Sequence, residues 1–413
     1  MDMAASFTAL PSSAEVVIIG GGVMGASIAY HLAKAGQRDV VLLERESFFG
    51  QGATGRCAGG IRYQFSTEIN IRLSLLSLAM LDRFEEETSQ AIDVRHCGYL
   101  FLLTREEDVA AFDRNVALQH RLGVRTEWLS GDEIRRRLPM MRLDDVLAGA
   151  WHPKDGLADP NGVVMGYVNA ARRRGVRLLN DVTVTGIDIS ASGGSASELS
   201  ASELSAPGDA FYKNRVTGVV TNRGRIETPI VVNAAGPWAA QVGRMAGLDL
   251  PILPIRRQWL STTPLLQIPQ DFPFVIDFAQ SLYFHREGDG LLTGMSNPDE
   301  APGFDQSVDR DWEIVAMEAA ARRMPLLESA GVVSRIAGLY EVTPDAHPIL
   351  GGAPVEGFHV CAGFSGHGFM HGPICGLLMA EEILNGRATT LDIDPLRFER
   401  FAAGAVRGEY NVV

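Results

Sequence analysis

Lysine and cysteine are both scarce in this sequence, and each shortage limits the chemistry that the protein can perform. Lys34, Lys154 and Lys213 are the only lysines among 37 basic residues, so few remain for a catalytic role. The four cysteines lie far apart and form no C-x-x-C pair, a spacing that favours neither a zinc site nor a disulfide framework. We therefore expect no metal centre.

Positive charge is also short relative to negative charge. The formal net charge at pH 7 is −13, so nucleic acid and anionic membrane surfaces are not expected as partners. Residues 1–14 lack the charged start and long apolar run of a signal peptide, and no apolar run reaches the ~20 residues of a membrane-spanning helix. The expected location is a reducing cytoplasm, without a membrane span.

The sequence does contain one complete β-α-β unit near its start. Within residues 15–19 (EVVII), the four residues after Glu15 form a continuous apolar, β-branched run, which is typical of a buried parallel strand. Helical periodicity follows over residues 26–35, and a second apolar run over 40–43 predicts the neighbouring strand. With 413 residues, the chain is long enough for a second core beyond this unit.

A glycine-rich turn with the spacing of a dinucleotide-binding site joins the first strand to the helix. Gly20 would allow the tight turn, Gly22 would let a pyrophosphate approach the backbone, and Gly25 would let the helix pack on the strand. The free N–H groups at the helix start would then face the phosphates. Glu44, at the end of the second strand, would accept hydrogen bonds from ribose hydroxyls. A purely structural glycine turn is the alternative.

A second glycine-rich loop, over residues 50–62 (GQGATGRCAGGIR), directly follows the second strand. A plain NAD dehydrogenase does not need a loop of this kind there. A flavin is wide and flat, and its phosphates and ring edge need a backbone that can pass very close to them. The loop therefore favours FAD over NAD.

The rest of the pattern predicts an α/β protein, α+β overall, with two interleaved domains. One is a Rossmann-type FAD-binding domain of discontinuous segments, and the other is a substrate domain with a mixed sheet. The expected ranges are 14–90, 150–240 and 330–400 for the FAD-binding domain, and 91–149 and 241–329 for the substrate domain. Residues 190–209 contain the tandem SASELSASELSA and little that could be buried, so a disordered-like surface loop is expected there.

Five motifs together resemble the FAD-dependent D-amino-acid oxidase superfamily. They are GGGVMGASIAYHLAKAG, GATGRCAGGIR, VVNAAGPW, GLYEVTPDAHPILG and GFSGHGFMHGP, and they follow the family's order across residues 14–385. Within the superfamily the sequence is most similar to sarcosine oxidases of the β-subunit type and to the β subunit of L-proline dehydrogenase. The resemblance implies an FAD-dependent oxidoreductase that acts on a small amino acid.

The resemblance also implies a set of cofactor contacts. Val184 matches the position whose backbone meets the adenine, and Trp238 stands at the mouth beside an Ala-x-Gly turn. The glycine-rich turn before the last helix meets the pyrimidine edge of the flavin, where a helix N-terminus would stabilise the negative charge of the reduced ring. The residues expected to bind FAD are Gly20, Gly22, Val23, Met24, Gly25, Glu44, Arg45, Gly52, Ala53, Thr54, Arg56, Cys57, Ala58, Gly60, Ile61, Val184, Ala234, Ala235, Gly236, Trp238, Gly338, Gly363, Phe364, Ser365, Gly366, His367, Gly368, Phe369 and Met370.

Arg62 aligns with the arginine that holds the substrate carboxylate in family members, and a guanidinium suits a planar two-point contact. Its alternative is a surface or ion-pairing arginine. His367, Tyr340, Tyr283 and His285 are the other candidate catalytic residues. A packed core histidine is the alternative for His367, and a buried core role is the alternative for Tyr283 and His285.

Two departures from the family pattern bear on the cofactor and on oxygen. Single-chain sarcosine oxidases attach their flavin to a cysteine in the block that begins at Gly338, and this block has none, so we expect non-covalent FAD. The same oxidases carry two lysines near the flavin, at the positions of Leu292 and Met370 here. Another cation, such as His367 or Arg286, would have to assist a reaction with oxygen.

Three functional hypotheses follow. The first is oxidation of the C–N bond of sarcosine or a similar N-substituted amino acid to an imine that hydrolyses, with oxygen as the acceptor and hydrogen peroxide as its product. The second is a proline, hydroxyproline or glycine dehydrogenase-type subunit that passes electrons to a partner or a quinone. The third is a non-catalytic flavin-binding assembly protein. Either a homo-oligomer or a complex with a partner subunit is compatible with the sequence.

Overall fold

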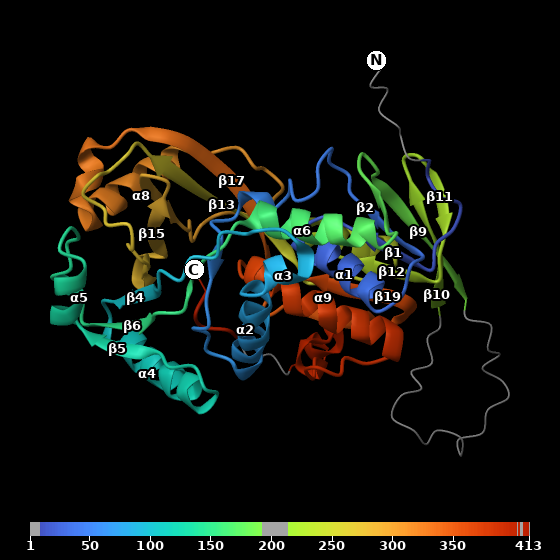
Figure 1. The fold of residues 1–413 in the computed structure, drawn as a ribbon, viewed down its shortest axis with the longest axis horizontal. Helices are drawn as coiled ribbons and strands as arrows, with labels where there is room; N and C mark the ends of the chain where they lie inside the picture. The colour runs from blue at the N-terminus through green and yellow to red at the C-terminus, as the bar shows by residue number, and fades with distance from the viewer. Residues whose placement is uncertain (1–8, 192–213, 403, 405–407, 413) are drawn as a thin grey trace.

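The computed structural model describes residues 9–191, 214–402, 404 and 408–412. Two large β-sheets lie beside each other along the longest axis of the molecule, and helices cover each of them (Figure 1). Most of the predicted surface loop 190–209 lies outside the described residues.

The first sheet contains the parallel strands of the nucleotide-binding unit. Its strands are β1 (Val16–Ile19), β2 (Val40–Leu43), β8 (Arg177–Leu179), β9 (Val184–Ala191), β10 (Asn214–Thr221), β11 (Gly224–Glu227), β12 (Ile230–Asn233), β18 (Ile349–Ala353) and β19 (Val355–Ala362). They follow the order β11-β10-β19-β12-β1-β2-β8, with β9 paired to β10 and β18 paired to β19. β1 pairs in parallel with β2 and β12, and every residue of β1 and β2 is buried. Burial on both faces explains why these two sequences are continuously apolar.

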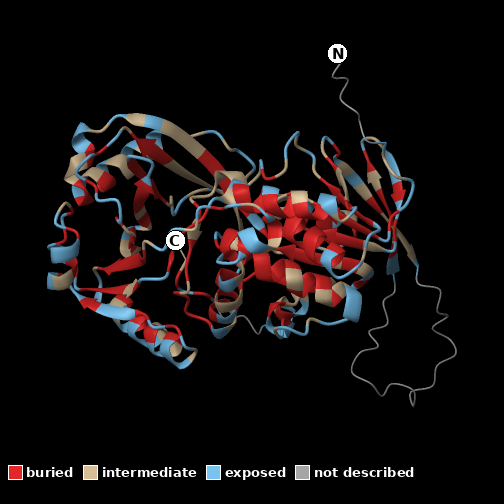
Figure 2. Ribbon diagram, in the orientation of Figure 1, coloured by how far each residue is buried: buried red, intermediate tan, exposed pale blue. Residues whose placement is uncertain are grey.

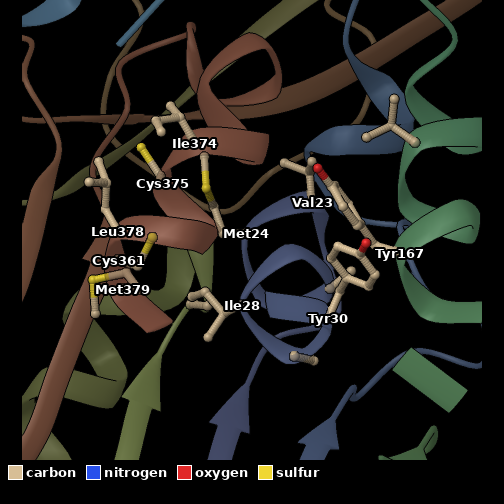
Figure 3. Packing of buried hydrophobic residues seen from close by; sticks show 14 of the residues in the cluster. Val23, Met24, Ile28, Tyr30, Tyr167, Cys361, Ile374, Cys375, Leu378 and Met379 are labelled. Carbon is tan, nitrogen blue, oxygen red and sulfur yellow. The ribbon is translucent and has the colours of Figure 1, made fainter. Parts of the chain in front are cut away.

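Three long helices pack in this half of the molecule: α1 (Val23–Lys34), α6 (Pro160–Arg173) and α9 (Gly368–Asn385). Figure 2 shows that they are largely buried, and Figure 3 shows α1 between side chains of α9 and Tyr167 of α6. A Cβ at Gly372 would lie 2.5 Å from Val23 Cγ2, and one at Gly376 would lie 2.0 Å from Ser27 Oγ. Both glycines are therefore needed for the close approach. Because the contacts advance in the same direction along α1 and α9, the N-termini of the two helices lie at the same end.

The second sheet forms the other half of the molecule. Its strands are, in spatial order, β17 (Val332–Val342), β13 (Leu253–Thr262), β16 (Gly290–Met295), β15 (Leu282–Glu287), β14 (Phe274–Asp277), β4 (Tyr99–Leu103), β6 (Ala148–His152) and β5 (Glu127–Ser130). One face, with Leu100 and Phe284, packs against α8 (Arg310–Arg323) and α5 (Gly131–Arg137). Successive residues of a strand point to opposite faces, so Tyr99 and Tyr283 belong to the other face.

The remaining elements join the two halves or cover them. They are the helices α2 (Glu68–Leu81), α3 (Phe84–Thr88), α4 (Glu106–Arg121) and α7 (Ala239–Met245), and the small sheet of β3 (Gly60–Ile61) and β7 (Gly156–Leu157).

The predicted α/β class and the β-α-β unit near the start of the chain are confirmed. Strand β17 falls in the range 330–400 assigned to the FAD-binding domain, yet it pairs with β13 in the second sheet, so the domain boundaries stay a prediction. In the described part of the chain no helix is long and apolar enough to cross a membrane. Within the same residues, no group of three or more His, Cys, Asp or Glu side chains is arranged to hold a metal ion.

Candidate functional site

A cavity of about 310 Å³ opens between the two sheets. Ile19, Leu43 and Ala234, at or just beyond the carboxyl ends of β1, β2 and β12, line one side of it. The N-terminal ends of α1 and α9 reach the same cavity through Gly22 and Gly368. Because open α/β sheets bind ligands at the carboxyl ends of their strands, this cavity is the candidate site.

The first glycine turn and Glu44 shape one end of the cavity. Gly20 has a φ of +110°, and a Cβ on it would lie 2.4 Å from the main-chain oxygen of Ala234. A Cβ on Gly25 would lie 1.9 Å from the oxygen of Gly20, so Gly25 allows the helix to pack on the turn. The Glu44 carboxylate accepts a hydrogen bond of 2.7 Å from the N–H of Gly21. Burial raises the pKa of Glu44, and this N–H partly opposes the shift.

The second glycine-rich loop passes between the first turn and strand β17. Thr54 begins a short 3₁₀ turn, and its Oγ1 accepts a hydrogen bond of 3.2 Å from the N–H of Val23. Arg56 donates from Nη1 to the oxygen of Ala337 at 2.8 Å. A Cβ on Gly338 would lie 3.0 Å from Arg56 Cβ, so a larger residue at 338 would require the loop to shift slightly.

An aromatic wall closes the end of the cavity expected to hold the adenine. The guanidinium carbon of Arg45 lies 3.6 Å from the centroid of the Trp238 ring, and Trp238 stacks on Phe304 at 5.6 Å. Val184 and Gly236 line the same cavity. A flat, partly cationic surface of this kind suits the stacking of a purine.

His367 also lines the cavity, immediately before α9. Its side chain is buried, and neither ring nitrogen has a hydrogen-bond partner among the described residues. Burial lowers the pKa of His367 well below its usual range, so the imidazole is neutral at pH 7. Two buried ring nitrogens without partners, on a residue that lines the cavity, call for a polar partner, and the polar edge of a bound flavin is one candidate.

Arg62 is 5 % exposed, and that exposed part faces the cavity. It donates hydrogen bonds to two main-chain oxygens, those of Gln64 and Asn411, and its guanidinium carbon lies 3.9 Å from the centroid of the Phe65 ring. Among the residues that the structure describes, no carboxylate forms an ion pair with Arg62. The ion-pairing alternative therefore finds no support among these residues.

Aromatic side chains from the second sheet form the wall above Arg62. Tyr99 stacks on Phe274 with centroids 4.2 Å apart, and Tyr283 lies 5.7 Å from the same ring. Burial raises the pKa of Tyr283 and of Tyr340, so these phenols stay neutral at pH 7. These rings give the wall an apolar body, and the tyrosines add neutral O–H groups to it.

His285 does not reach the cavity. It is 1 % exposed, packs behind Phe274 with ring centroids 5.0 Å apart, and its Nδ1 lies 3.0 Å from the oxygen of Arg286. Its position matches the buried core alternative. Ile61, in β3 against β7, and Gly363, which donates its N–H to Glu341 at 2.9 Å, also lie outside the lining.

The structure brings most of the other predicted residues together around one cavity. Those that line it are Gly20, Gly22, Val23, Met24, Glu44, Arg45, Gly52, Ala53, Thr54, Arg56, Cys57, Ala58, Gly60, Arg62, Val184, Ala234, Ala235, Gly236, Trp238, Tyr283, Gly338, Tyr340, Phe364, Ser365, Gly366, His367, Gly368, Phe369 and Met370. Their shared location agrees with the sequence analysis, and their individual roles stay proposals.

Lining residues that the sequence analysis did not single out include Arg257, Glu341 and Val412. Arg257 stands on β13, where no motif distinguished it from Arg256. Glu341 follows the candidate Tyr340 directly, and its carboxyl group has a pKa raised to about 7 by burial. Tyr340 and Glu341 are neighbours on β17, and neighbouring side chains of a strand point in opposite directions. This alternation was the signal in the sequence that could have distinguished the two residues. Val412 lies beyond the last recognisable motif, so nothing in the sequence singled it out.

Comparisons with known proteins agree with this geometry. Residues 15–382 match the family model described as FAD dependent oxidoreductase. Mitochondrial sarcosine dehydrogenase of Homo sapiens is 34 % identical over 391 residues, which are 92 % of this chain and 40 % of that protein. Mitochondrial dimethylglycine dehydrogenase of Rattus norvegicus is 31 % identical over 94 % of this chain and 45 % of its own length. The chain thus spans less than half the length of these two curated relatives.

Two solved structures resemble the fold of this chain over nearly its whole length. The L-proline dehydrogenase from P. horikoshii is 32 % identical, with a TM-score of 0.83 over 96 % of this chain and 100 % of its own. The glycine oxidase from Geobacillus kaustophilus is 25 % identical, with a TM-score of 0.79 over 94 % of this chain and 99 % of its own.

Proposed function

The chain belongs to the FAD dependent oxidoreductase family, and from that premise we propose that it oxidises the C–N bond of a small secondary amino acid such as sarcosine. The observation that carries the proposal is Arg62, a buried guanidinium that faces the cavity with only main-chain oxygens as partners. A carboxylate is the ligand that such a group binds best. The names of the two dehydrogenase relatives support an N-methyl amino acid.

In this scheme the side chains of the cavity bind and orient the substrate. Arg62 holds the carboxylate, while Tyr99, Phe274 and Tyr283 exclude water from the α-carbon. Bound FAD supplies the two-electron acceptor for the hydride that leaves that carbon. The nitrogen gives up its proton, so the product is an imine, and water then cleaves it to a carbonyl compound and an amine. Orientation supplies much of the rate, so the scheme requires no dedicated base.

Oxygen is the first candidate electron acceptor, and a partner protein or quinone is the second. The four positions that the sequence analysis considered for a cation beside the flavin favour the second. Leu292 is buried outside the cavity lining, and Met370 lines it, so neither position offers a cation. His367 is neutral at pH 7, and Arg286 is paired with Asp289 at 3.0 Å.

An anaerobic titration of the purified yellow protein tests the proposal. Sarcosine, L-proline, dimethylglycine and glycine are added in turn, and loss of flavin absorbance reports reduction. Bleaching by a secondary amino acid is expected, and no bleaching by any of them would instead support a non-catalytic assembly protein. Admitting oxygen or a dye to the reduced protein then identifies the acceptor, because a dehydrogenase recolours much faster with the dye.

A further inference from the structure

Arg257 lies on the cavity wall formed by the second sheet. It belongs to β13 and stands opposite Gly338 of β17. Paired residues of antiparallel strands share a face of the sheet, and both residues line the cavity. Arg256, the preceding residue, points to the opposite face because side chains alternate along a strand.

The two neighbouring arginines differ in their partners. Arg256 pairs with three carboxylates, those of Asp305 at 2.9 Å, Glu300 at 3.1 Å and Asp309 at 3.4 Å. Arg257 donates from Nη1 to the oxygen of Arg256 at 2.9 Å. Its buried Nε has no hydrogen-bond partner, and no carboxylate pairs with it, in the part of the chain that the structure describes.

Arg257 is half-buried, and its Nε is the buried part of the guanidinium. A buried donor without a partner costs free energy that a ligand able to accept from it would recover. The guanidinium carbon of Arg257 also lies 5.4 Å from the centroid of the Tyr340 ring, which is too weak a contact to replace an anion. Three arginines of the cavity lining, Arg56, Arg62 and Arg257, have no acidic partner among the described residues. Arg56 donates to the main-chain oxygen of Ala337, and the proposed substrate carboxylate occupies only Arg62, so Arg257, with its unmet Nε, remains for a second acidic group.

We propose that Arg257 binds a second acidic group of the substrate, so that the substrate is a dicarboxylic secondary amine, an amino acid whose N-substituent carries its own carboxylate. The inference rests on the proposed function, in which Arg62 binds the first carboxylate. Arg257 is then the residue that distinguishes dicarboxylic from monocarboxylic amines. Its role concerns specificity, while the oxidised C–N bond stays the same.

A pair of unreactive thioethers tests the site in the FAD-loaded protein. Thiodiacetate and (methylthio)acetate differ by one carboxylate, and each reports its dissociation constant by perturbing the flavin spectrum. Thiodiacetate should bind about tenfold to a hundredfold more tightly, the amount expected for one charge-assisted contact. Arg257→Gln should abolish this difference by weakening thiodiacetate alone. Arg256→Gln is the matched control, because it should lower the melting temperature and leave the difference intact.

Kinetics with sarcosine and iminodiacetate, which also differ by one carboxylate, provide the second measurement. Arg257→Gln should lower kcat/KM for iminodiacetate relative to sarcosine by about tenfold or more. Equal binding of the two thioethers by the parent protein would overturn the inference. Equal effects of Arg257→Gln on sarcosine and iminodiacetate, or an effect on flavin reoxidation alone, would also overturn it. If Arg257→Gln does not retain FAD, Arg257→Met repeats the test with a side chain of similar length. Failure of every amine to reduce the flavin would refute the proposed function, whereas the thioethers would still report on Arg257.

Discussion

The Nη2 atom of Arg62 donates a hydrogen bond of 2.5 Å to the main-chain oxygen of Asn411. The two residues are 349 positions apart, and the contact brings residues 408–412 to the substrate side of the cavity. Val412 then lines the cavity itself. This segment therefore fixes the orientation of the proposed carboxylate-binding residue and forms part of the wall.

Glu409 anchors the segment, and its removal should weaken substrate binding. Its buried carboxylate accepts hydrogen bonds from the N–H groups of Ser66 at 2.7 Å and Thr67 at 3.1 Å. In Glu409→Gln an amide N–H₂ would face some of these donors, so at least one bond would be lost. The KM for sarcosine should rise about threefold to tenfold, with kcat and FAD content nearly unchanged.

Glu399, which is exposed, provides the matched control. Glu399→Gln should leave the KM within about twofold. If Glu409→Gln lowered the melting temperature but not substrate affinity, the segment would be a structural support without influence on Arg62.

The sequence predicted what is local and missed what depends on distant pairing. Gly20 and Glu44 could be assigned because a β-α-β unit surrounds its ligand within a short stretch of chain. Arg256 and Arg257 are chemically identical neighbours, and only the register of β13 against β17 decides which one faces the cavity. Val412 reaches the cavity through contacts with residues more than 300 positions earlier, which no motif encodes.

Gly22→Ala and Gly25→Ala should impair the protein in different ways. A Cβ on Gly22 meets only Thr54 Oγ1, at 3.3 Å, so the fold should tolerate it while the pyrophosphate loses its close approach. A Cβ on Gly25 would lie 1.9 Å from the oxygen of Gly20, which should lower the free energy of unfolding by about 1–3 kcal/mol. FAD content and thermal unfolding of the FAD-free proteins separate the two effects. A Gly22→Ala protein that retains stoichiometric FAD would show that the pyrophosphate binds elsewhere.

Glu341 should make the FAD-free protein less stable as the pH rises from about 4.5 to 7. Burial raises the pKa of this carboxyl group from 4.5 to about 7. Within that window the folded state keeps a proton that the unfolded state has released, so its contribution to the free energy of unfolding falls by up to about 1.4 kcal/mol per pH unit. Glu341→Gln should remove this slope, with its largest stabilisation relative to the parent above pH 7. Parallel slopes for both proteins in denaturant titrations would exclude the effect.

FAD should be released when the protein is precipitated with acid. Cys57 is a cysteine that lines the cavity, and burial raises the pKa of its thiol to about 11, so the nucleophilic thiolate is rare at pH 7. The block that begins at Gly338, where the resemblance to single-chain sarcosine oxidases implies the attachment cysteine, contains no cysteine. The supernatant should hold the yellow colour, and Cys57→Ser should behave in the same way. Colour that stays with the pellet of the parent protein but not of Cys57→Ser would reveal a covalent link.

Arg62 carries the substrate assignment, so its substitution is the most direct test. Arg62→Lys keeps a charge but loses the planar two-point contact, and one lost charge-assisted hydrogen bond should lower kcat/KM for sarcosine about tenfold to a hundredfold. Arg62→Ala should lower it further, because both binding and orientation are lost. The flavin spectrum and FAD content should stay normal in both variants, and the preference for amines that bear a carboxylate should disappear. If Arg62→Ala oxidised sarcosine as the parent does, or lost its FAD instead, another residue must bind the carboxylate, and Arg257 would then be the first one to examine.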